Sequence, residues 1–530
     1  MERESSTLHG VTLRTLLVVP PEAPGFVPSS FFNPLPHPPL GIAVLRGQAV
    51  AAGYRHLALL DTRGHPPFAK GIYPLVRRGL LRREGSVLAG VLSWINAHRH
   101  RDNEAAFVAQ VLPPPISLRS ILVAGCARPH LPEERVPALT VALRQTRPDL
   151  VGISVTTPSQ LYPALRLAGE VKREAPSSFV VLGGPVVTMN LGFLTACADL
   201  ALLVDGLAEG AGERALLPLI RCLHDGSELD QVPNLHLCRE GRFVPPVRRE
   251  GYIPEDVRIL PDFKGLHVPF VPHRLSIGCP WHRCTYCTSK RLARDHLLLP
   301  PEQAVEQLLA LGRTYRATRF DLVDEALPPA FLEAFCHRLV ALDQRFDWTC
   351  NLCLSPDLAS PGLARLIARA GCRRVVLGLE AAVPRTLQRM GKPHRCEEVP
   401  AILRSLRGAG LTVVLNLLLG FPGETRDEVH QTLEFLEGHR DLFHHLCVAV
   451  FSLDDGSEVF SRPAHYGVTG IDREDKYLTR RFGYRYRTED GLSREELETV
   501  IRGLYRRFHR TWPDPRRAPR VGRSRKSDRP

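Results

Sequence analysis

Three cysteines lie close together near the middle of the chain. Cys279, Cys284 and Cys287 fall within nine residues, and Gly278 and Pro280 flank the first of them. Thiolates at this spacing can surround one soft metal centre, and iron–sulfur clusters are held by cysteine thiolates. With three ligands instead of four, a cubane cluster keeps one iron open for a substrate or cofactor. We therefore predict that these three cysteines are metal ligands at a catalytic centre.

A structural zinc site is the competing interpretation, because Cys-x2-Cys is also a zinc-binding spacing. Structural zinc requires four ligands, and the nearest second pair is Cys350 and Cys353. That pair lies in an expected strand, where residues three apart point to opposite faces. The spacing therefore favours a cluster over zinc.

The composition sets the broad class. A chain of 530 residues with 44% hydrophobic residues suggests two to four domains. No apolar run approaches the roughly 18 residues that span a bilayer, and no signal peptide is evident. Thirteen cysteines without a regular framework fit a reducing compartment, so we expect a cytoplasmic protein. The net charge is +13, and seven basic residues and one acidic residue lie between residues 516 and 529. We interpret residues 513–530 as a basic disordered tail rather than a nucleic-acid-binding segment.

Polar and glycine-rich loops follow the expected strands of residues 11–235. Alternating strands and helices predict a Rossmann-like, doubly wound sheet, in which ligands bind beyond the carboxyl ends of the strands. An insertion over about 66–135 interrupts this domain, and 80–97 within it is expected to be helical. The expected strands are 13–19, 56–60, 150–155, 179–182 and 200–204, with helices over 41–52 and 161–174.

The second half of the chain repeats a strand–helix unit. After a linker at 236–268, residues 269–465 hold about six such units, which predict a partial (β/α)6 barrel of the TIM type. Polar residues end each strand, and active sites of such barrels lie at those ends. Residues 466–512 are expected to form a small α/β extension. The expected strands are 320–323, 348–354, 374–379, 413–419 and 447–452; the expected helices are 301–311, 329–342, 361–370, 397–409 and 425–436.

These motifs resemble the cobalamin-binding class of the radical S-adenosylmethionine (SAM) family. The resemblance covers most of residues 11–465 and depends on short stretches in both halves. In the second half they are the cysteine triplet, 378–380, 386–392 and 420–425; in the first half they are 38–41, 148–154, 181–185 and 209–213.

The resemblance implies a [4Fe–4S] cluster on the three cysteines, SAM on its open iron, and cobalamin on the first domain. Glu380 and Asn416 are candidate SAM contacts, although a surface ion pair and a core amide remain alternatives for them. The other implied SAM contacts are Tyr286, Gly420 and Pro422. The implied cobalamin contacts are Ser154, Thr156, Gly183, Gly184 and Glu209.

Two features depart from the family pattern. The family's usual spacing is Cys-x3-Cys-x2-Cys, whereas this chain has Cys-x4-Cys-x2-Cys, with Trp281 as the extra residue. The Asp-x-His-x-x-Gly motif of methyltransferase-type cobalamin domains is missing from residues 1–235. We therefore expect no histidine on the lower face of cobalt.

The function implied by the resemblance is radical C-methylation of an unactivated carbon in a small-molecule or peptide intermediate. A flavodoxin or ferredoxin would donate electrons. Cyclisation, ring contraction or oxidation without methyl transfer is the alternative. Less favoured alternatives are tRNA methylthiolation, for which Cys126, Cys197, Cys222 and Cys238 form no second cluster motif, and a non-enzymatic cobalamin sensor.

Overall fold

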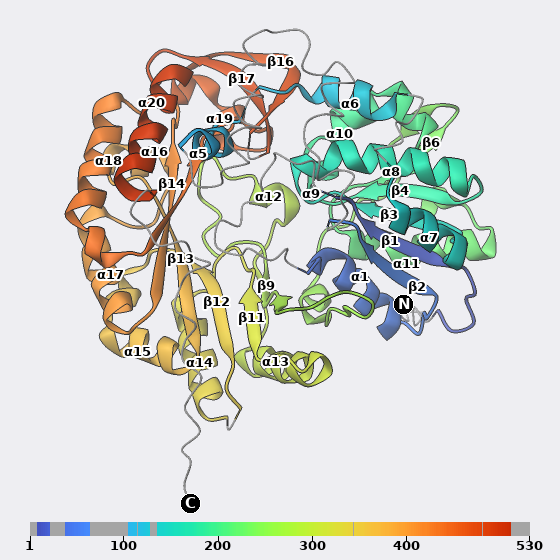
Figure 1. The fold of residues 1–530 in the computed structure, drawn as a ribbon, viewed down its shortest axis with the longest axis horizontal. Coiled ribbons are helices and arrows are strands. Elements are labelled where there is room, and N and C mark those ends of the chain that lie inside the picture. The colour runs from blue at the N-terminus through green and yellow to red at the C-terminus, as the bar shows by residue number, and fades with distance from the viewer. Residues whose placement is uncertain are drawn as a thin grey trace, which may run out of the picture.

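Two sheets lie side by side in the computed structural model (Figure 1). The structure describes residues 8–21, 38–63, 104–113, 115–127, 135–342, 344–479 and 481–509. The helix expected over 80–97 and the basic tail at 513–530 lie outside this part of the chain.

The first sheet has the strand order β2-β1-β3-β4-β5-β6-β7. Its first five strands are parallel, and β6 and β7 are antiparallel additions at one edge. All five residues of β1 are buried, as expected for a parallel strand covered on both faces. The strands are β1 (Thr15–Val19), β2 (Leu57–Asp61), β3 (Leu150–Ser154), β4 (Phe179–Gly183), β5 (Gly206–Ala208), β6 (Leu235–Arg239) and β7 (Arg242–Val244).

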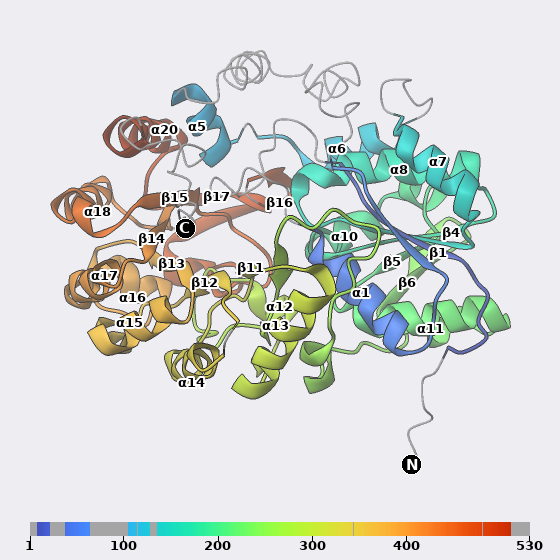
Figure 2. The same cartoon turned by 60° about the horizontal axis from the view of Figure 1, so that its bottom comes forward.

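Helices cover both faces of this sheet (Figure 2). One face packs against α6 (Leu118–Cys126), α7 (Pro137–Thr146) and α8 (Leu161–Glu174), and the other against α1 (Leu40–Ala51) and α11 (Gly212–Asp225). The short helices α9 (Pro185–Met189) and α10 (Leu191–Thr195) follow β4. This three-layer arrangement confirms the expected Rossmann-like class.

Two expectations for this half differ from the structure. Residues 200–204 were expected to form a strand, but Ala198–Leu202 is a 3-10 helix and the strand at this edge is β5. The segment 236–268 was expected to be a linker, yet β6 and β7 form a hairpin of the first sheet. Short apolar runs do not distinguish strand from helix by periodicity, which explains the first error.

The second sheet has six parallel strands in the order β15-β14-β13-β12-β11-β8. Within the described residues its edge strands β8 and β15 do not pair, so the barrel is open. The strands are β8 (Val271–His273), β11 (Arg319–Leu322), β12 (Asp347–Leu352), β13 (Cys372–Glu380), β14 (Thr412–Leu419) and β15 (His445–Val450).

Proline starts several of the helices that cover this sheet. It is favoured at the first helical position, because its fixed φ suits a helix and its missing N–H would lack a partner there anyway. The helices are α13 (Pro301–Tyr315), α14 (Pro329–Val340), α15 (Pro361–Arg369), α16 (Pro384–Met390), α17 (Val399–Gly408) and α18 (Arg426–Gly438).

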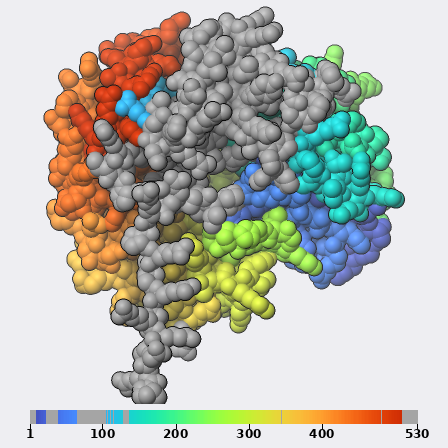
Figure 3. Space-filling model, viewed as in Figure 1, coloured from blue at the N-terminus to red at the C-terminus, as the bar shows by residue number. Residues whose placement is uncertain are grey.

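The C-terminal segments connect the two halves. The hairpin of β16 (Val468–Leu478) and β17 (Phe482–Thr488) places Leu478 and Phe482 in the core of the first domain. The insertion helix α5 (Glu104–Val111) packs on α20 (Arg494–Leu504), and in Figure 3 its blue atoms lie among red and orange ones. Among the described residues, no helix combines the length and hydropathy needed to cross a membrane.

Candidate active site at the mouth of the open barrel

The cysteine loop follows the short strand β9 (Ser276–Ile277), and one buried carboxylate holds the start of the loop. Oδ1 of Asp324, just beyond β11, accepts hydrogen bonds from the backbone N–H groups of Leu275 (2.9 Å) and Ser276 (2.5 Å) and from the Ser276 hydroxyl (2.6 Å). Burial raises the pKa of Asp324 to about 6 although these donors lower it. Asp324 therefore fixes the start of the loop three residues before Cys279.

The extra residue of the loop is used as an anchor. The indole N–H of Trp281 donates to the Gly391 carbonyl over 2.7 Å, and the Arg283 guanidinium lies 5.1 Å from the Trp281 ring. The Thr285 N–H donates to the Met390 carbonyl at 3.0 Å. The longer spacing is thus accommodated by attachment of the loop to the end of α16.

The three thiols are half-buried and have different surroundings. A hydrogen bond from Cys353 lowers the pKa of Cys279 to about 5, whereas burial raises that of Cys284 to about 11. Among the described residues no three His, Cys, Asp or Glu side chains are grouped to hold one metal ion. Thiolates that bind separate irons of a cluster need not meet at one point, so this donor set fits a [4Fe–4S] cluster.

Cys353 is a neighbour of this site that sequence reasoning did not select. Cys350 contacts Cys372 in the core, while Cys353 faces Cys279. The two side chains have different partners, as strand geometry predicted when they were set aside as a zinc pair. Cys353 directly follows β12, and its position at a strand end was the sequence feature that could have indicated a role in the site.

A buried ion pair lies beside Cys284. Lys392 Nζ is 3.2 Å from Glu380 Oε1, with exposed side-chain fractions of 8% and 14%. Burial would lower the pKa of Lys392, but Glu380 and the neighbouring thiols raise it, so the amine stays charged. Burial, and then Glu380, raise the pKa of Tyr286. Sequence reasoning selected Tyr286 and Glu380 but not Lys392, which is separated from Glu380 by helix α16.

Asn416 lies in β14 opposite Gly378 of β13 and is half-buried. We find no hydrogen bond from its side-chain amide to any residue that the structure describes. A half-buried amide without a described protein partner is accessible to water or to a ligand. Gly378 keeps space for the Glu380–Lys392 pair, because a Cβ there would lie 2.8 Å from Glu380 Oε1.

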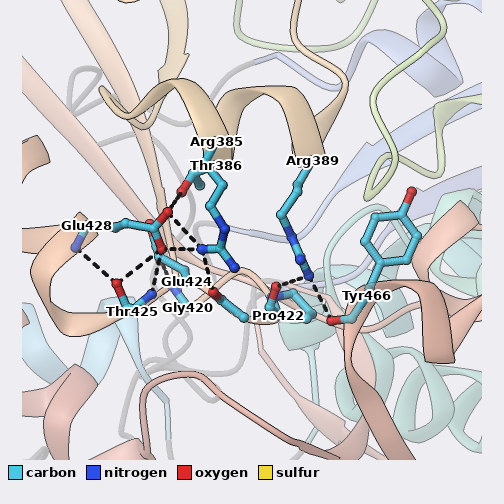
Figure 4. Close-up of polar contacts among 10 residues, drawn as sticks. Arg385, Thr386, Arg389, Gly420, Pro422, Glu424, Thr425, Glu428 and Tyr466 are labelled. Atoms are coloured by element: carbon cyan, nitrogen blue, oxygen red, sulfur yellow. Dashed lines mark hydrogen bonds and ion pairs between the residues drawn. The ribbon is translucent and has the colours of Figure 1, made fainter.

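The turn at 420–425 is held by the protein's own side chains (Figure 4). The Gly420 N–H donates to Glu424 Oε2 over 2.6 Å, and Arg389 Nη2 donates to the Pro422 carbonyl over 3.0 Å. Gly420 has a φ of 72°, a left-handed conformation that favours glycine. Because the Gly420 N–H already donates to Glu424, it is not free to donate to a ligand. The backbone of Gly420 and Pro422 can still lie close to one.

A cavity of about 230 Å³ lies between the two sheets. Its walls come from the carboxyl ends of first-sheet strands, including Ser154 and Thr156, and from Pro272 and Val323 of the barrel. Arg63 contributes a guanidinium, and no histidine, cysteine or lysine of the described part lines it. Thr156 donates its N–H and hydroxyl to Gln160 Oε1, which fixes the loop after β3.

A second, smaller cavity of about 80 Å³ extends between the first sheet and helices α1 and α11. Gly183 and Gly184 line it together with Gly152. A Cβ on Gly152 would lie 2.7 Å from Leu17 Cδ2, and one on Gly184 would lie 2.6 Å from the Val155 carbonyl oxygen. The backbone at Gly184 therefore passes too close to Val155 for any other residue without a shift.

Glu209 does not line either cavity. Its Oε2 is 3.0 Å from both His236 Nε2 and Arg249 Nε. Burial raises its pKa, but these two partners outweigh burial and lower it. The structure thus brings four of the five expected cobalamin contacts to the cavities and gives Glu209 local partners instead.

Comparison with known proteins defines the class. Residues 274–436 match the family model of the Radical SAM superfamily. The matched region contains the three-cysteine loop at the mouth of the open parallel barrel, so residues 274–436 have the features of the radical SAM superfamily, whose cofactors are a [4Fe–4S] cluster and SAM.

Two individual relatives share less than 30% sequence identity with this chain. An uncharacterized methyltransferase of Pyrococcus horikoshii, PH0819, is 28% identical over 306 residues, which are 55% of this chain and 65% of that protein. An anaerobic magnesium-protoporphyrin IX monomethyl ester cyclase of Rubrivivax gelatinosus is 26% identical over 394 residues, covering 68% of this chain and 66% of the cyclase. The chain therefore spans slightly less than two thirds of the length of these relatives.

Solved structures share the whole architecture. The cobalamin-dependent SAM radical enzyme OxsB with aqua-cobalamin bound has a TM-score of 0.60 at 15% identity, covering 91% of this chain and 65% of OxsB. The radical SAM methyltransferase TsrM from Kitasatospora setae, with cobalamin and a [4Fe–4S] cluster bound, has a TM-score of 0.55 at 17% identity, covering 87% and 80%. At these identities the likeness concerns the fold.

Proposed function

We propose that this protein is a cobalamin-dependent radical SAM enzyme that methylates an unactivated carbon of a small-molecule or peptide intermediate. The observation that carries the proposal is the cavity between the sheets, whose walls come from the strand ends of both domains. A cofactor held there by the first domain would lie against Pro272 and Val323 of the barrel. A radical SAM barrel working alone would not require such a space.

The chain's own residues have distinct roles in this proposal. Cys279, Cys284 and Cys287 hold the cluster, and Lys392, Glu380 and Asn416 provide charge and hydrogen bonds for SAM beside it. When bound, the cluster and SAM supply radical chemistry and cobalamin supplies a methyl group, while the protein binds, orients and excludes water.

In this proposal the first domain accommodates cobalamin in its cavities and does not supply a ligand to cobalt. Gly183 and Gly184 line the smaller cavity, and Ser154 and Thr156 line the larger one. Because its described lining contains no histidine, the protein offers no imidazole to cobalt at these walls.

A second candidate function is cyclisation or oxidation without methyl transfer. It is supported by the similarity to the magnesium-protoporphyrin cyclase, which matches a larger share of this chain than PH0819 does. The two candidates share every cofactor and differ in the fate of the SAM methyl group.

The test is anaerobic purification with iron, sulfide and cobalamin, followed by absorbance spectra and turnover with methyl-deuterated SAM. Methyltransferase activity places the deuterated methyl group in the product and releases S-adenosylhomocysteine. Formation of 5′-deoxyadenosine with product but without deuterium incorporation favours the second candidate. Stoichiometric zinc with no cluster absorbance contradicts both.

A further inference from the structure

The cysteine loop caps the end of helix α16. A helix leaves its last carbonyl groups without donors of its own, so other groups must satisfy them. Here the Thr285 hydroxyl donates to the Arg389 carbonyl over 2.9 Å, and the Thr285 N–H donates to the Met390 carbonyl over 3.0 Å. The indole N–H of Trp281 donates to the Gly391 carbonyl over 2.7 Å. Three successive carbonyl groups therefore receive donors from the loop that carries the cysteines.

Glycine at position 391 allows a close approach at this junction. Its φ of 68° is the left-handed conformation in which many helices end and which favours glycine. A Cβ at this position would lie 2.5 Å from the Arg283 carbonyl oxygen and 3.4 Å from Thr285 Cγ2. The backbones of the loop and of the turn are therefore in direct contact, and the Trp281 hydrogen bond adds a directional link between them.

Lys392 directly follows this turn and belongs to the buried ion pair. Its N–H donates to the Leu387 carbonyl over 3.0 Å, and its Nζ donates to Glu380 Oε1 over 3.2 Å. A Cβ on Gly378 would lie 3.0 Å from Nζ, so the amine has little room on that side. The position of Nζ therefore depends on the turn, and the turn is bonded to the cysteine loop.

The extra residue of the loop thus bonds to the residue just before the lysine of this pair. We propose that Trp281 is a positioning residue for SAM, because its bond to Gly391 holds Lys392 beside Glu380. The inference rests on the proposed function, in which the ion pair contacts SAM. The additional loop residue then serves cofactor binding as well as attachment of the loop.

Trp281→Phe tests the inference, because it removes the indole N–H and keeps an aromatic ring. In protein reconstituted with cluster and cobalamin, the iron content and the absorbance should equal those of the parent. The Kd for SAM is measured by anaerobic isothermal titration without a reductant. It should rise about fivefold, which is the effect of losing one ordinary hydrogen bond.

Trp348→Phe is the matched control. The indole N–H of Trp348 donates to the Ala370 carbonyl over 2.9 Å, just beyond the end of α15. This bond lies at the start of β12, away from the mouth of the barrel. The same chemical change there removes an equivalent bond to a helix end and should leave the SAM affinity at the parent value.

A double-mutant cycle separates positioning from a general loosening of the loop. Lys392→Met should weaken SAM binding by itself. Adding Trp281→Phe should cause little further loss, since both changes act through the same amine. Losses that multiply would mean that Trp281 acts independently of Lys392, and they would overturn the inference.

An unchanged Kd for SAM in Trp281→Phe also overturns the inference. If that variant does not retain the cluster, Gly391→Ala examines the same junction from the helix side. It should weaken SAM binding as well, and a parental Kd in Gly391→Ala is equally contrary. A parent protein that holds no cluster, or that holds a cluster and binds no SAM, contradicts the proposed function instead.

Discussion

Cys279 and Cys353 touch each other at the edge of the site, yet we assign only Cys279 to the cluster. Cys353 belongs to the end of β12, and its pKa is raised by its hydrogen bond to Cys279 and by burial. It therefore remains a neutral thiol beside a thiolate. The difference between these neighbours can be tested directly.

We expect alanine at Cys279, Cys284 or Cys287 to abolish the cluster's visible absorbance and to leave less than about a tenth of the bound iron, since each thiolate holds one iron. Cys353→Ala is the matched control and should retain both signals. Iron and sulfide analysis after anaerobic reconstitution provides the measurement. Loss of iron in Cys353→Ala would point to four thiolate ligands and no open iron.

Among the elements, the turn between β14 and α18 contains an acid with a strongly shifted pKa. Burial raises the pKa of Glu424 to about 8, although the Gly420 and Phe421 N–H groups lower it. In the unfolded chain a glutamate has a pKa of about 4.3. From about pH 4.5 to 8 the unfolded state has therefore released a proton that the folded state keeps.

This difference predicts that stability falls as the pH rises from 5 to 8, by up to a few kcal/mol from this group. Glu424→Gln should flatten that dependence, because the amide does not titrate. Urea midpoints at pH 5, 6.5 and 8 are the measurement, with the exposed Glu434→Gln as the control. An unchanged pH profile in Glu424→Gln would show that this carboxyl is ionised in the folded state.

The strand end of β4 provides a test of the first domain. In Gly183→Leu we expect the added side chain to fill the smaller cavity and to prevent cobalamin binding, while the iron content stays that of the parent. Gly192→Leu on α10 is the control, since a Cβ there meets nothing within 4 Å. Equal cobalamin absorbance in both variants would place the cofactor elsewhere.

Sequence patterns predicted the helices and strands better than they predicted the contacts between side chains. Apolar runs ended by Gly, Pro or acidic residues located most strands of both sheets, because burial and turn chemistry are local properties. The edge hairpin of β6 and β7 was missed, since its few buried residues give a weak pattern. Lys392 and Cys353 were missed as site residues because their positions beside the cysteine loop depend on how segments distant in the chain pack together.

At the scale of the whole molecule, one lysine joins three parts. Lys476 belongs to the hairpin, pairs with Asp455 of the barrel segment and donates to the Met189 carbonyl of the first domain. Its side chain is 1% exposed. A buried ammonium group with these partners stabilises only the closed arrangement of the three parts.

Lys476→Met should lower stability by about 3 kcal/mol, because the Met189 carbonyl loses its donor and Asp455 keeps only its ion pair with Arg291. Thermal unfolding followed by circular dichroism measures the change, and the exposed Lys264→Met is the control. Equal midpoints for the two variants would mean that the hairpin is held by apolar packing alone.

The position of the hairpin along the chain bears on how the protein is made. β16 and β17 follow every barrel strand, so the ribosome releases them after the barrel and the first domain. Domains generally fold as units during synthesis, with earlier segments first. For the proposed enzyme we therefore expect cofactors to be loaded before the hairpin docks, so that a translational pause after residue 465 lengthens the time available for loading.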